Sequence, residues 1–254
     1  MRRLPNEKIE KNELYSYYQN DINLLGSEGI VLLSKDSLIS RKIFHEAIID
    51  ESFIGENKLN KLQLLYQIKD FLQDIKILKT ISCEGKFVGY DTISKYPHQR
   101  ITTPDKEKII KYLKQTKKLL DYFHSQDIVF GDVKKSNILL SKETNICSFC
   151  DLDNIQIKNF PIDTFNKYIF DFIRERNLVS LDADVYMHNL LVLQMLFYEN
   201  EDYSFIIDKL LFTPETIEKY FTKEAEKDII CMQEHFLDYK GGYLIDNLDE
   251  SKVR

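Results

Sequence analysis

The chain has 254 residues, which is enough for one large domain or two small ones with a real hydrophobic core. Hydrophobic residues make up 43% and charged residues 30%, a composition typical of folded proteins and not of disordered ones. The net charge of −6 excludes the basic balance of a dedicated nucleic-acid-binding protein, and no apolar run approaches the roughly 18 residues of a membrane helix.

The first hundred residues are rich in strand signals. Residues 1–15, MRRLPNEKIEKNELY, lack a signal-peptide core, so we expect a cytoplasmic location. Residues 24–44 contain two apolar runs around the polar turn 34–37, which predicts a β-hairpin. Residues 56–78 have apolar residues at helical spacing and predict a helix. The stretch 77–94, ILKTISCEGKFVGYDTIS, predicts a second hairpin with its turn at residues 84–86.

After Tyr96-Pro97 the sequence favours helices. A helix is predicted from Thr103-Pro104 to about Gln126, with proline at its first position. Its expected buried residues are Ile109, Ile110, Leu113, Leu120 and Phe123. Amphipathic helices are expected from about Tyr203, and a frayed tail at DNLDESKVR. We therefore predict an α+β fold, with a small strand-rich lobe over about 1–95 and a larger helical lobe over about 96–254.

Cys147 and Cys150 form a lone CxxC pair within ICSFCDLD, a short apolar run that predicts a buried strand. Side chains three residues apart on a strand point to opposite faces. A zinc site would need a second cysteine or histidine pair at suitable spacing, and none is evident in the sequence. Core packing is therefore the preferred interpretation.

The stretch FGDVKKSNILL, residues 130–140, is followed by CSFCDLDN across a strand-length gap. Phosphoryl transfer needs a carboxylate to orient the attacking hydroxyl, a cation to neutralise the moving phosphoryl group, and oxygen ligands for magnesium. Asp132, Lys134, Asn137 and Asp151 are residues of these types. The alternative is an ordinary solvated loop between two strands.

These motifs resemble the catalytic loop and metal-binding segment of the protein kinase superfamily, whose signatures are HRDLKxxN and DFG. Here Phe130-Gly131-Asp132 stands in place of His-Arg-Asp, and Asp151-Leu152-Asp153 in place of Asp-Phe-Gly. This pattern is most similar to a bacterial branch of kinase-like proteins, in which GKFVGY, residues 85–90 here, also recurs. The resemblance implies a bilobal, protein-kinase-like fold formed by residues 1–254 as a single domain.

The resemblance also implies roles for individual residues. Asp132 would orient the nucleophilic hydroxyl, Lys134 would steady the transferred phosphoryl group, and Asn137 and Asp151 would hold Mg²⁺. Asp184 falls at the position that braces the catalytic loop, although Asp182 or Asp184 would also serve as a plain helix cap.

The nucleotide-binding residues follow from the same resemblance. LGSEGIVLL resembles a shortened glycine-rich loop with Gly26 and Gly29, and Lys42 falls at the phosphate-contacting lysine. Its expected partner on the following helix is Glu56, with Glu51 as the alternative. The adenine would rest on backbone near Thr92 and Ser94 and on apolar lining such as Val31.

Three functions remain open at this point. The first is an ATP- and Mg²⁺-dependent kinase that phosphorylates Ser or Thr of an unidentified protein. The second is a small-molecule kinase resembling the aminoglycoside and choline phosphotransferases, which commonly carry histidine where this chain has Lys134. The third is a pseudokinase that binds partners without turnover. Under each function we expect neither membrane insertion nor direct binding of nucleic acid.

Overall fold

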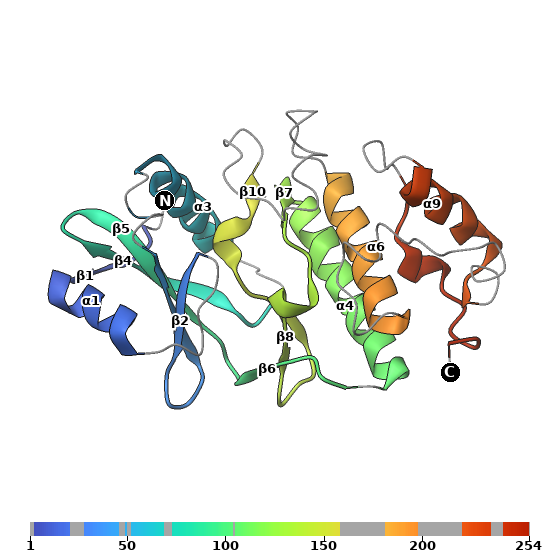
Figure 1. The fold of residues 1–254 in the computed structure, drawn as a ribbon, viewed down its shortest axis with the longest axis horizontal. Coiled ribbons are helices and arrows are strands. Elements are labelled where there is room, and N and C mark those ends of the chain that lie inside the picture. The colour runs from blue at the N-terminus through green and yellow to red at the C-terminus, as the bar shows by residue number, and fades with distance from the viewer. Residues whose placement is uncertain are drawn as a thin grey trace. The chain divides into compact units, whose positions relative to one another are not determined.

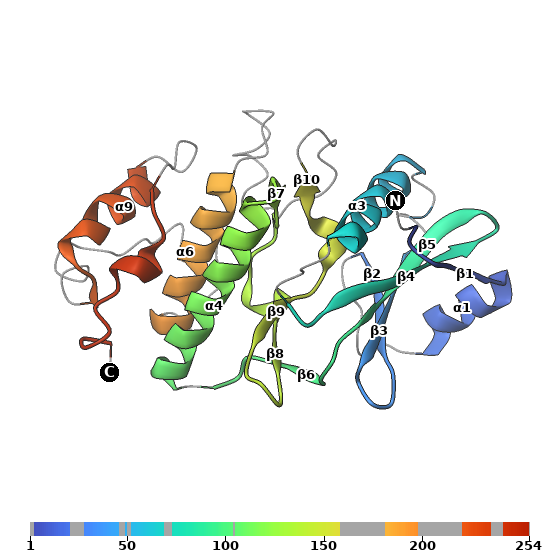
Figure 2. The ribbon, with the colours of Figure 1, turned by 180° about the vertical axis from the view of Figure 1, so that it is seen from behind.

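The computed structural model describes residues 3–20, 28–45, 49, 52–68, 73–103, 105–157, 181–197, 220–234 and 241–253. The chain forms two compact units, and strands and helices are mixed as in an α+β protein (Figure 1 and, from behind, Figure 2). The first unit comprises Met1–Gln99 and Leu140–Asp153, and the second comprises Arg100–Leu139 and Asn154–Arg254.

Residues 140–153 thus belong to the first unit, whereas the sequence assigned them to the C-terminal lobe. The Gln73 side chain gives a physical reason. Its Nε2 donates to the Phe149 carbonyl at 3.0 Å, and its Oε1 accepts from the Phe149 N–H at 2.8 Å. A buried amide that satisfies both polar groups of a strand residue ties that strand to the unit.

The first unit is built on a five-stranded sheet with the order β1-β4-β5-β3-β2. Its strands are β1 Asn6–Ile9, β2 Gly29–Leu33, β3 Ile39–Phe44, β4 Lys76–Cys83 and β5 Lys86–Ile93. β1 runs parallel to β4, and the other neighbours are antiparallel. Both predicted hairpins are confirmed as β2-β3 and β4-β5.

Two helices lie on opposite sides of this sheet, α1 (Lys11–Asn20) and α3 (Ser52–Gln67) (Figure 1). Leu14 of α1 packs in one apolar cluster with Ile43 of β3. Successive strand residues face opposite sides, so the neighbouring Lys42 faces the side of α3. The predicted helix over 56–78 was too long. Residues 76–78 belong to β4, in which Lys76 and Ile77 pair with β5, and a paired strand cannot continue the helix.

A polar network fastens β1 and α1 to the sheet. The Arg41 guanidinium donates to both carboxylate oxygens of Asp91, at 2.8 and 2.9 Å. It also donates to Glu7 of β1 at 2.7 Å and to the Tyr17 hydroxyl of α1 at 2.8 Å. Because the guanidinium presents its donors in a rigid planar fork, one arginine fixes several partners at once.

The second unit contains two long helices, α4 (Lys106–His124) and α6 (Leu181–Phe197), which lie side by side (Figure 2). They are antiparallel, since His124 contacts Asp184 while Thr116 contacts His188. All five residues predicted to be buried in α4 are buried. The predicted start at Thr103-Pro104 was early, because Asp105 caps the helix by accepting from the Lys108 N–H at 3.2 Å.

Short strands complete the described structure. β6 (His98–Arg100), β8 (Ile138–Ser141) and β9 (Cys147–Phe149) form one sheet, and β7 (Ile128–Val129) pairs with β10 (Gln156–Ile157). Cys147 is buried in β9, as predicted, and Cys150 is half-buried. Two single turns of 3₁₀ helix, η1 (Lys135–Asn137) and η2 (Leu152–Asn154), follow β7 and β9.

Near the C-terminus, η4 (Leu244–Asn247) packs against α9 (Lys223–Glu234). Leu248 bridges to Phe221, and Val253 is buried. The expectation of a frayed tail at residues 246–254 is therefore wrong for the part described, because its apolar residues Leu248 and Val253 are buried.

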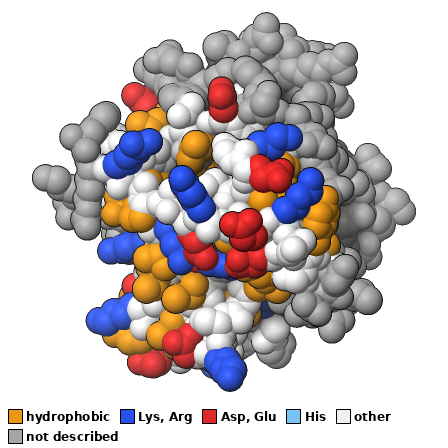
Figure 3. Space-filling model, turned by 90° about the vertical axis from the view of Figure 1, so that its left-hand side faces the viewer, with side chains coloured by type: hydrophobic (Ala, Val, Ile, Leu, Met, Phe, Trp, Pro, Cys, Tyr) orange, Lys and Arg blue, Asp and Glu red, His pale blue; other side chains and the backbone are white. Residues whose placement is uncertain are grey.

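Acidic and basic side chains are interspersed among the described residues on the face drawn in Figure 3, and neither sign forms a continuous stripe there. Proteins that bind nucleic acid usually carry a stripe of basic side chains along the path of the phosphate backbone. Within the described residues, no helix combines the length and apolar character needed to cross a membrane.

Candidate active site

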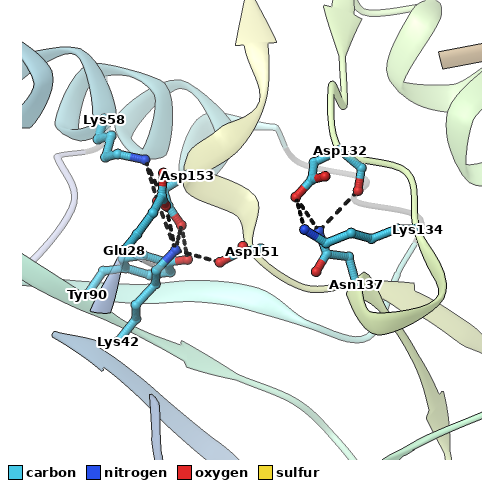
Figure 4. A network of polar contacts seen from close by, with 9 residues as sticks. All are labelled: Glu28, Lys42, Lys58, Tyr90, Asp132, Lys134, Asn137, Asp151 and Asp153. Carbon is cyan, nitrogen blue, oxygen red and sulfur yellow. Dashed lines mark hydrogen bonds and ion pairs between the residues drawn. The ribbon is translucent and has the colours of Figure 1, made fainter. Parts of the chain in front are cut away.

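The loop after β7 brings together three residues that the sequence singled out. Asp132 is buried, and one of its carboxylate oxygens accepts from Lys134 Nζ at 2.7 Å and from Asn137 Nδ2 at 2.8 Å (Figure 4). Asn137 Nδ2 also donates to the Asp132 carbonyl at 3.0 Å. This second bond closes the loop on itself, because the single turn of η1 carries Asn137 back over Asp132. The carboxylate is thus held in one orientation by two donors.

Asp184, in the first turn of α6, fixes the same loop from behind. Its two carboxylate oxygens accept from the backbone N–H groups of Phe130 at 2.7 Å and Gly131 at 2.8 Å. His124 Nε2 lies 3.0 Å from the carboxylate. The predicted bracing role of Asp184 is confirmed. Gly131 has φ of +78°, a conformation that side chains with a Cβ rarely adopt.

Lys42 of β3 lies at the centre of a second cluster, in the first unit. It pairs across the sheet with Val31 of β2 and with Tyr90 of β5. Directly opposed residues place their side chains on one face, so Val31, Lys42 and Tyr90 form a row there. The Lys42 ammonium contacts Asp151 at 2.5 Å, Asp153 at 2.9 Å and Glu28 at 3.2 Å (Figure 4).

The two aspartates of the DxD motif occupy different environments. Asp153 is fully buried, and burial by itself would raise its pKa. The ammonium groups of Lys42 and Lys58 outweigh this and hold the pKa of Asp153 well below its ordinary value. Its carboxylate also accepts from the Tyr90 hydroxyl at 2.5 Å. Asp153 is therefore a buried, charged anchor for two lysines.

Asp151 is the more accessible of the pair, with its side chain 29% exposed. Burial raises the pKa of Asp151, and the charges of Asp153 and Glu28 add to that shift, although Lys42 opposes it. Its environment thus disfavours the negative charge in the absence of a further cation. Its φ of +60° lies in the left-handed region, which aspartate and asparagine tolerate better than most residues.

Sequence reasoning missed Lys58. Its ammonium is fully buried and contacts Asp153 at 2.7 Å and Glu28 at 3.3 Å. Burial by itself would lower the pKa of Lys58, but the Asp153 and Glu28 carboxylates raise it, so the group stays charged. A signal was present in the sequence, since Lys58 lies four residues before the buried Leu62 and so shares its helix face.

The expected partner of Lys42, Glu56, does not lie among its contacts. Glu56 is exposed on α3, because it is two positions away from the face that carries Lys58 and Leu62. α3 turns a lysine toward Lys42 where the resemblance implies a glutamate, and Asp153 supplies the carboxylate. The alternative, Glu51, lies outside the described residues, as does Gly26.

The remaining predicted nucleotide contacts have structural roles of their own. A Cβ on Gly29 would lie 2.2 Å from the Ile43 carbonyl oxygen, so the spacing of β2 and β3 requires glycine there. Thr92 lies within β5, opposite Ser40 and Ile77. The Ser94 N–H already donates to the Leu38 carbonyl at 2.9 Å.

The donor chemistry of the predicted magnesium ligands fits the ion. Mg²⁺ prefers oxygen ligands and is commonly held by one or two protein carboxylates together with substrate phosphates. Asp151 offers a partly exposed carboxylate, and Asn137 binds Asp132 through its amide nitrogen, leaving oxygen as the other polar end of that side chain. Among the described residues, no group of three or more His, Cys, Asp or Glu side chains is arranged to hold a metal.

Comparison with known proteins shows a similarity to a protein kinase over part of the chain. The chain is 28% identical over 130 residues to Protein kinase 2 of Dictyostelium discoideum. The match covers 46% of this chain and 23% of that protein, so the chain spans less than a quarter of the relative's length. No family model matches the chain.

Proposed function

We propose that this protein is a kinase with a bilobal, protein-kinase-like fold, which transfers the γ-phosphoryl group of ATP to a Ser or Thr hydroxyl of a protein. The observation that carries the proposal is the Asp132 carboxylate, held by Lys134 and Asn137 in a loop that Asp184 braces. A solvated linker would not need four such groups to converge. The partial similarity to a protein kinase supports the same conclusion.

In the proposed reaction, the Asp132 carboxylate accepts the proton of the attacking hydroxyl. A bond forms between that oxygen and the γ-phosphorus, and the bond from phosphorus to the β,γ-bridging oxygen breaks to release ADP. Lys134 would offset charge on the moving phosphoryl group, since its ammonium is 40% exposed and lies beside Asp132. Such chemistry depends mainly on positioning and charge stabilisation.

Lys42 would hold the nucleotide phosphates, and Asn137 and Asp151 would hold Mg²⁺. The ion would neutralise negative charge on the phosphates. Lysine at position 134 favours a protein substrate over the small-molecule kinases, in which histidine is common. A binding module without turnover is the second candidate, because Glu28 already contacts the Lys42 ammonium at 3.2 Å.

Purified protein incubated with radiolabelled ATP, Mg²⁺ and a mixture of Ser/Thr-containing proteins tests the proposal. We expect label on protein, and we expect Asp132→Asn to reduce turnover by orders of magnitude while ATP affinity changes little. Asp127→Asn is the matched control. Asp127 is exposed, and its φ of +56° suits asparagine, so this variant should retain full turnover.

Two outcomes would contradict the proposal. ATP binding without transfer to any protein would favour the binding module. Transfer to aminoglycosides or choline, but not to protein, would favour a small-molecule kinase. If ATP affinity and turnover fell in parallel in Asp132→Asn, Asp132 would have a structural role.

A further inference from the structure

Two buried ammonium groups meet at one carboxylate oxygen in the first unit. Lys42 Nζ lies 3.2 Å and Lys58 Nζ lies 3.3 Å from the same oxygen of Glu28 (Figure 4). Both ammoniums also contact Asp153, and both lie 5.4 Å from the centre of the Phe44 ring. Two cations placed this close, with little access to water, form a strong site for a bridging anion.

The two bridging carboxylates differ in how firmly they are held. Asp153 is fully buried, contacts Lys58 at 2.7 Å and Lys42 at 2.9 Å, and accepts from Tyr90 as well. Glu28 makes longer contacts through a single oxygen, and its side chain is 17% exposed. It precedes β2 directly, at the edge of the sheet. Glu28 is therefore the carboxylate that can leave without breaking up the cluster.

The charges indicate what would replace it. Lys42 and Lys58 supply two positive charges, and Glu28, Asp151 and Asp153 supply three negative charges. An anionic phosphate oxygen in place of the Glu28 oxygen would leave this balance unchanged and would bridge the same two ammoniums. Departure of Glu28 with no incoming anion would leave the two lysines sharing Asp153, with Asp151 as a further contact of Lys42.

We propose that Lys42 and Lys58 together form a phosphate-binding site, and that Glu28 fills this site until a phosphate group displaces it. Lys58 is then a second phosphate-binding cation, contributed by α3. Glu28 is an internal competitor, whose withdrawal accompanies phosphate binding. The inference rests on the proposed function for the identity of the phosphate carrier, a nucleotide, but the site itself requires only the two lysines and the exchangeable carboxylate.

The test compares the binding of three probes by calorimetry: ATP, adenosine and inorganic tripolyphosphate, without added Mg²⁺. Glu28→Gln should tighten ATP and tripolyphosphate by about tenfold and leave adenosine unchanged, because adenosine carries no phosphate. Glu56→Gln removes the same charge from an exposed position on α3 and should change each affinity less than twofold. Adding Lys58→Met to Glu28→Gln should remove the gain for both phosphate-bearing probes.

The inference would be wrong if Glu28→Gln left the affinities for ATP and tripolyphosphate unchanged. It would also be wrong if Glu28→Gln tightened the binding of adenosine by the same factor. A gain that survived Lys58→Met would remove Lys58 from the site. If the double variant failed to fold, the comparison of Glu28→Gln with Glu56→Gln would still decide whether Glu28 competes with phosphate. A gain for tripolyphosphate with none for ATP would assign the site to free polyphosphate.

These measurements do not require turnover, so the inference and the proposed function can fail separately. Tighter phosphate binding in Glu28→Gln, combined with no phosphoryl transfer by the wild-type protein, would support the phosphate site and refute the kinase activity. Full kinase activity of the wild-type protein, combined with phosphate affinities that Glu28→Gln leaves unchanged, would support the kinase activity and refute the phosphate site.

Discussion

Replacement of each DxD aspartate by asparagine should separate their roles. Asp153→Asn removes the charge that two buried ammoniums contact at 2.7 and 2.9 Å. Breaking a buried ion pair by removing one partner destabilises a protein by roughly 3–5 kcal/mol. The lowered pKa of Asp153 has the same meaning, because the fold stabilises its charged form and asparagine cannot supply that charge.

Asp151→Asn should have a much smaller effect on stability, about 1 kcal/mol or less. Its side chain is 29% exposed, and its raised pKa shows that the fold disfavours its charge. Asparagine also tolerates its φ of +60°, whereas alanine would add backbone strain and obscure the comparison.

Thermal denaturation measures the difference. For a chain of this size, 1 kcal/mol corresponds to roughly 2–4 °C in Tm, so Asp153→Asn should lower Tm by about 10 °C. Asp151→Asn should lower it by no more than about 4 °C. Urea denaturation provides an independent check of the same free energies. Equal losses in the two variants, or a larger loss in Asp151→Asn, would refute the division into an anchor and an accessible carboxylate.

Three further predictions concern metal, pH and regulation. Asp151→Ala should abolish the extra thermal stabilisation that we expect Mg²⁺ to give to an ATP complex, and unchanged stabilisation would remove Asp151 from the proposed metal site. Burial lowers the pKa of His188 to about 4, so the unfolded chain takes up the proton first. Stability should therefore fall by about 3 kcal/mol between pH 6.5 and 4, and denaturation curves of His188→Gln should lack this slope. Kinase activity should survive phosphatase treatment, because Gly131 has no charged side chain with which to bind a phosphate group between residues 153 and 184. Loss of activity that rephosphorylation restored would contradict this.

Local patterns predicted much of the described fold. Turn residues between apolar runs identified both hairpins, and helical spacing identified the buried face of α4. β1 was missed, because it is a short, polar strand whose parallel partner, β4, lies about seventy residues away. Local periodicity does not indicate a pairing between strands so far apart in the sequence. The contact of β1 with Arg41 also forms only in the folded unit.

Part of the candidate site was likewise predictable from local sequence, and part of it was not. The loop from Asp132 to Asn137 was predictable because its chemistry is concentrated in six residues. The counter-ions of Lys42 were not, since Glu28 and Asp153 come from segments far apart in the sequence. Lys58 was overlooked because lysines on helices are usually solvated, even though its spacing to Leu62 placed it on the buried face.

The backbone conformation at Gly131 also limits which residues can replace this glycine. With φ of +78°, any residue carrying a Cβ would add about 1–2 kcal/mol of strain. A shift to an ordinary φ would pull the Gly131 N–H away from Asp184, which it contacts at 2.8 Å. An arginine here, as in kinases that sense activation-segment phosphorylation, would therefore require compensating changes in the loop and in α6. Installing such control calls for redesign of the loop and of α6 together, because the strain at position 131 and the contact of its N–H with Asp184 have to be accommodated at the same time.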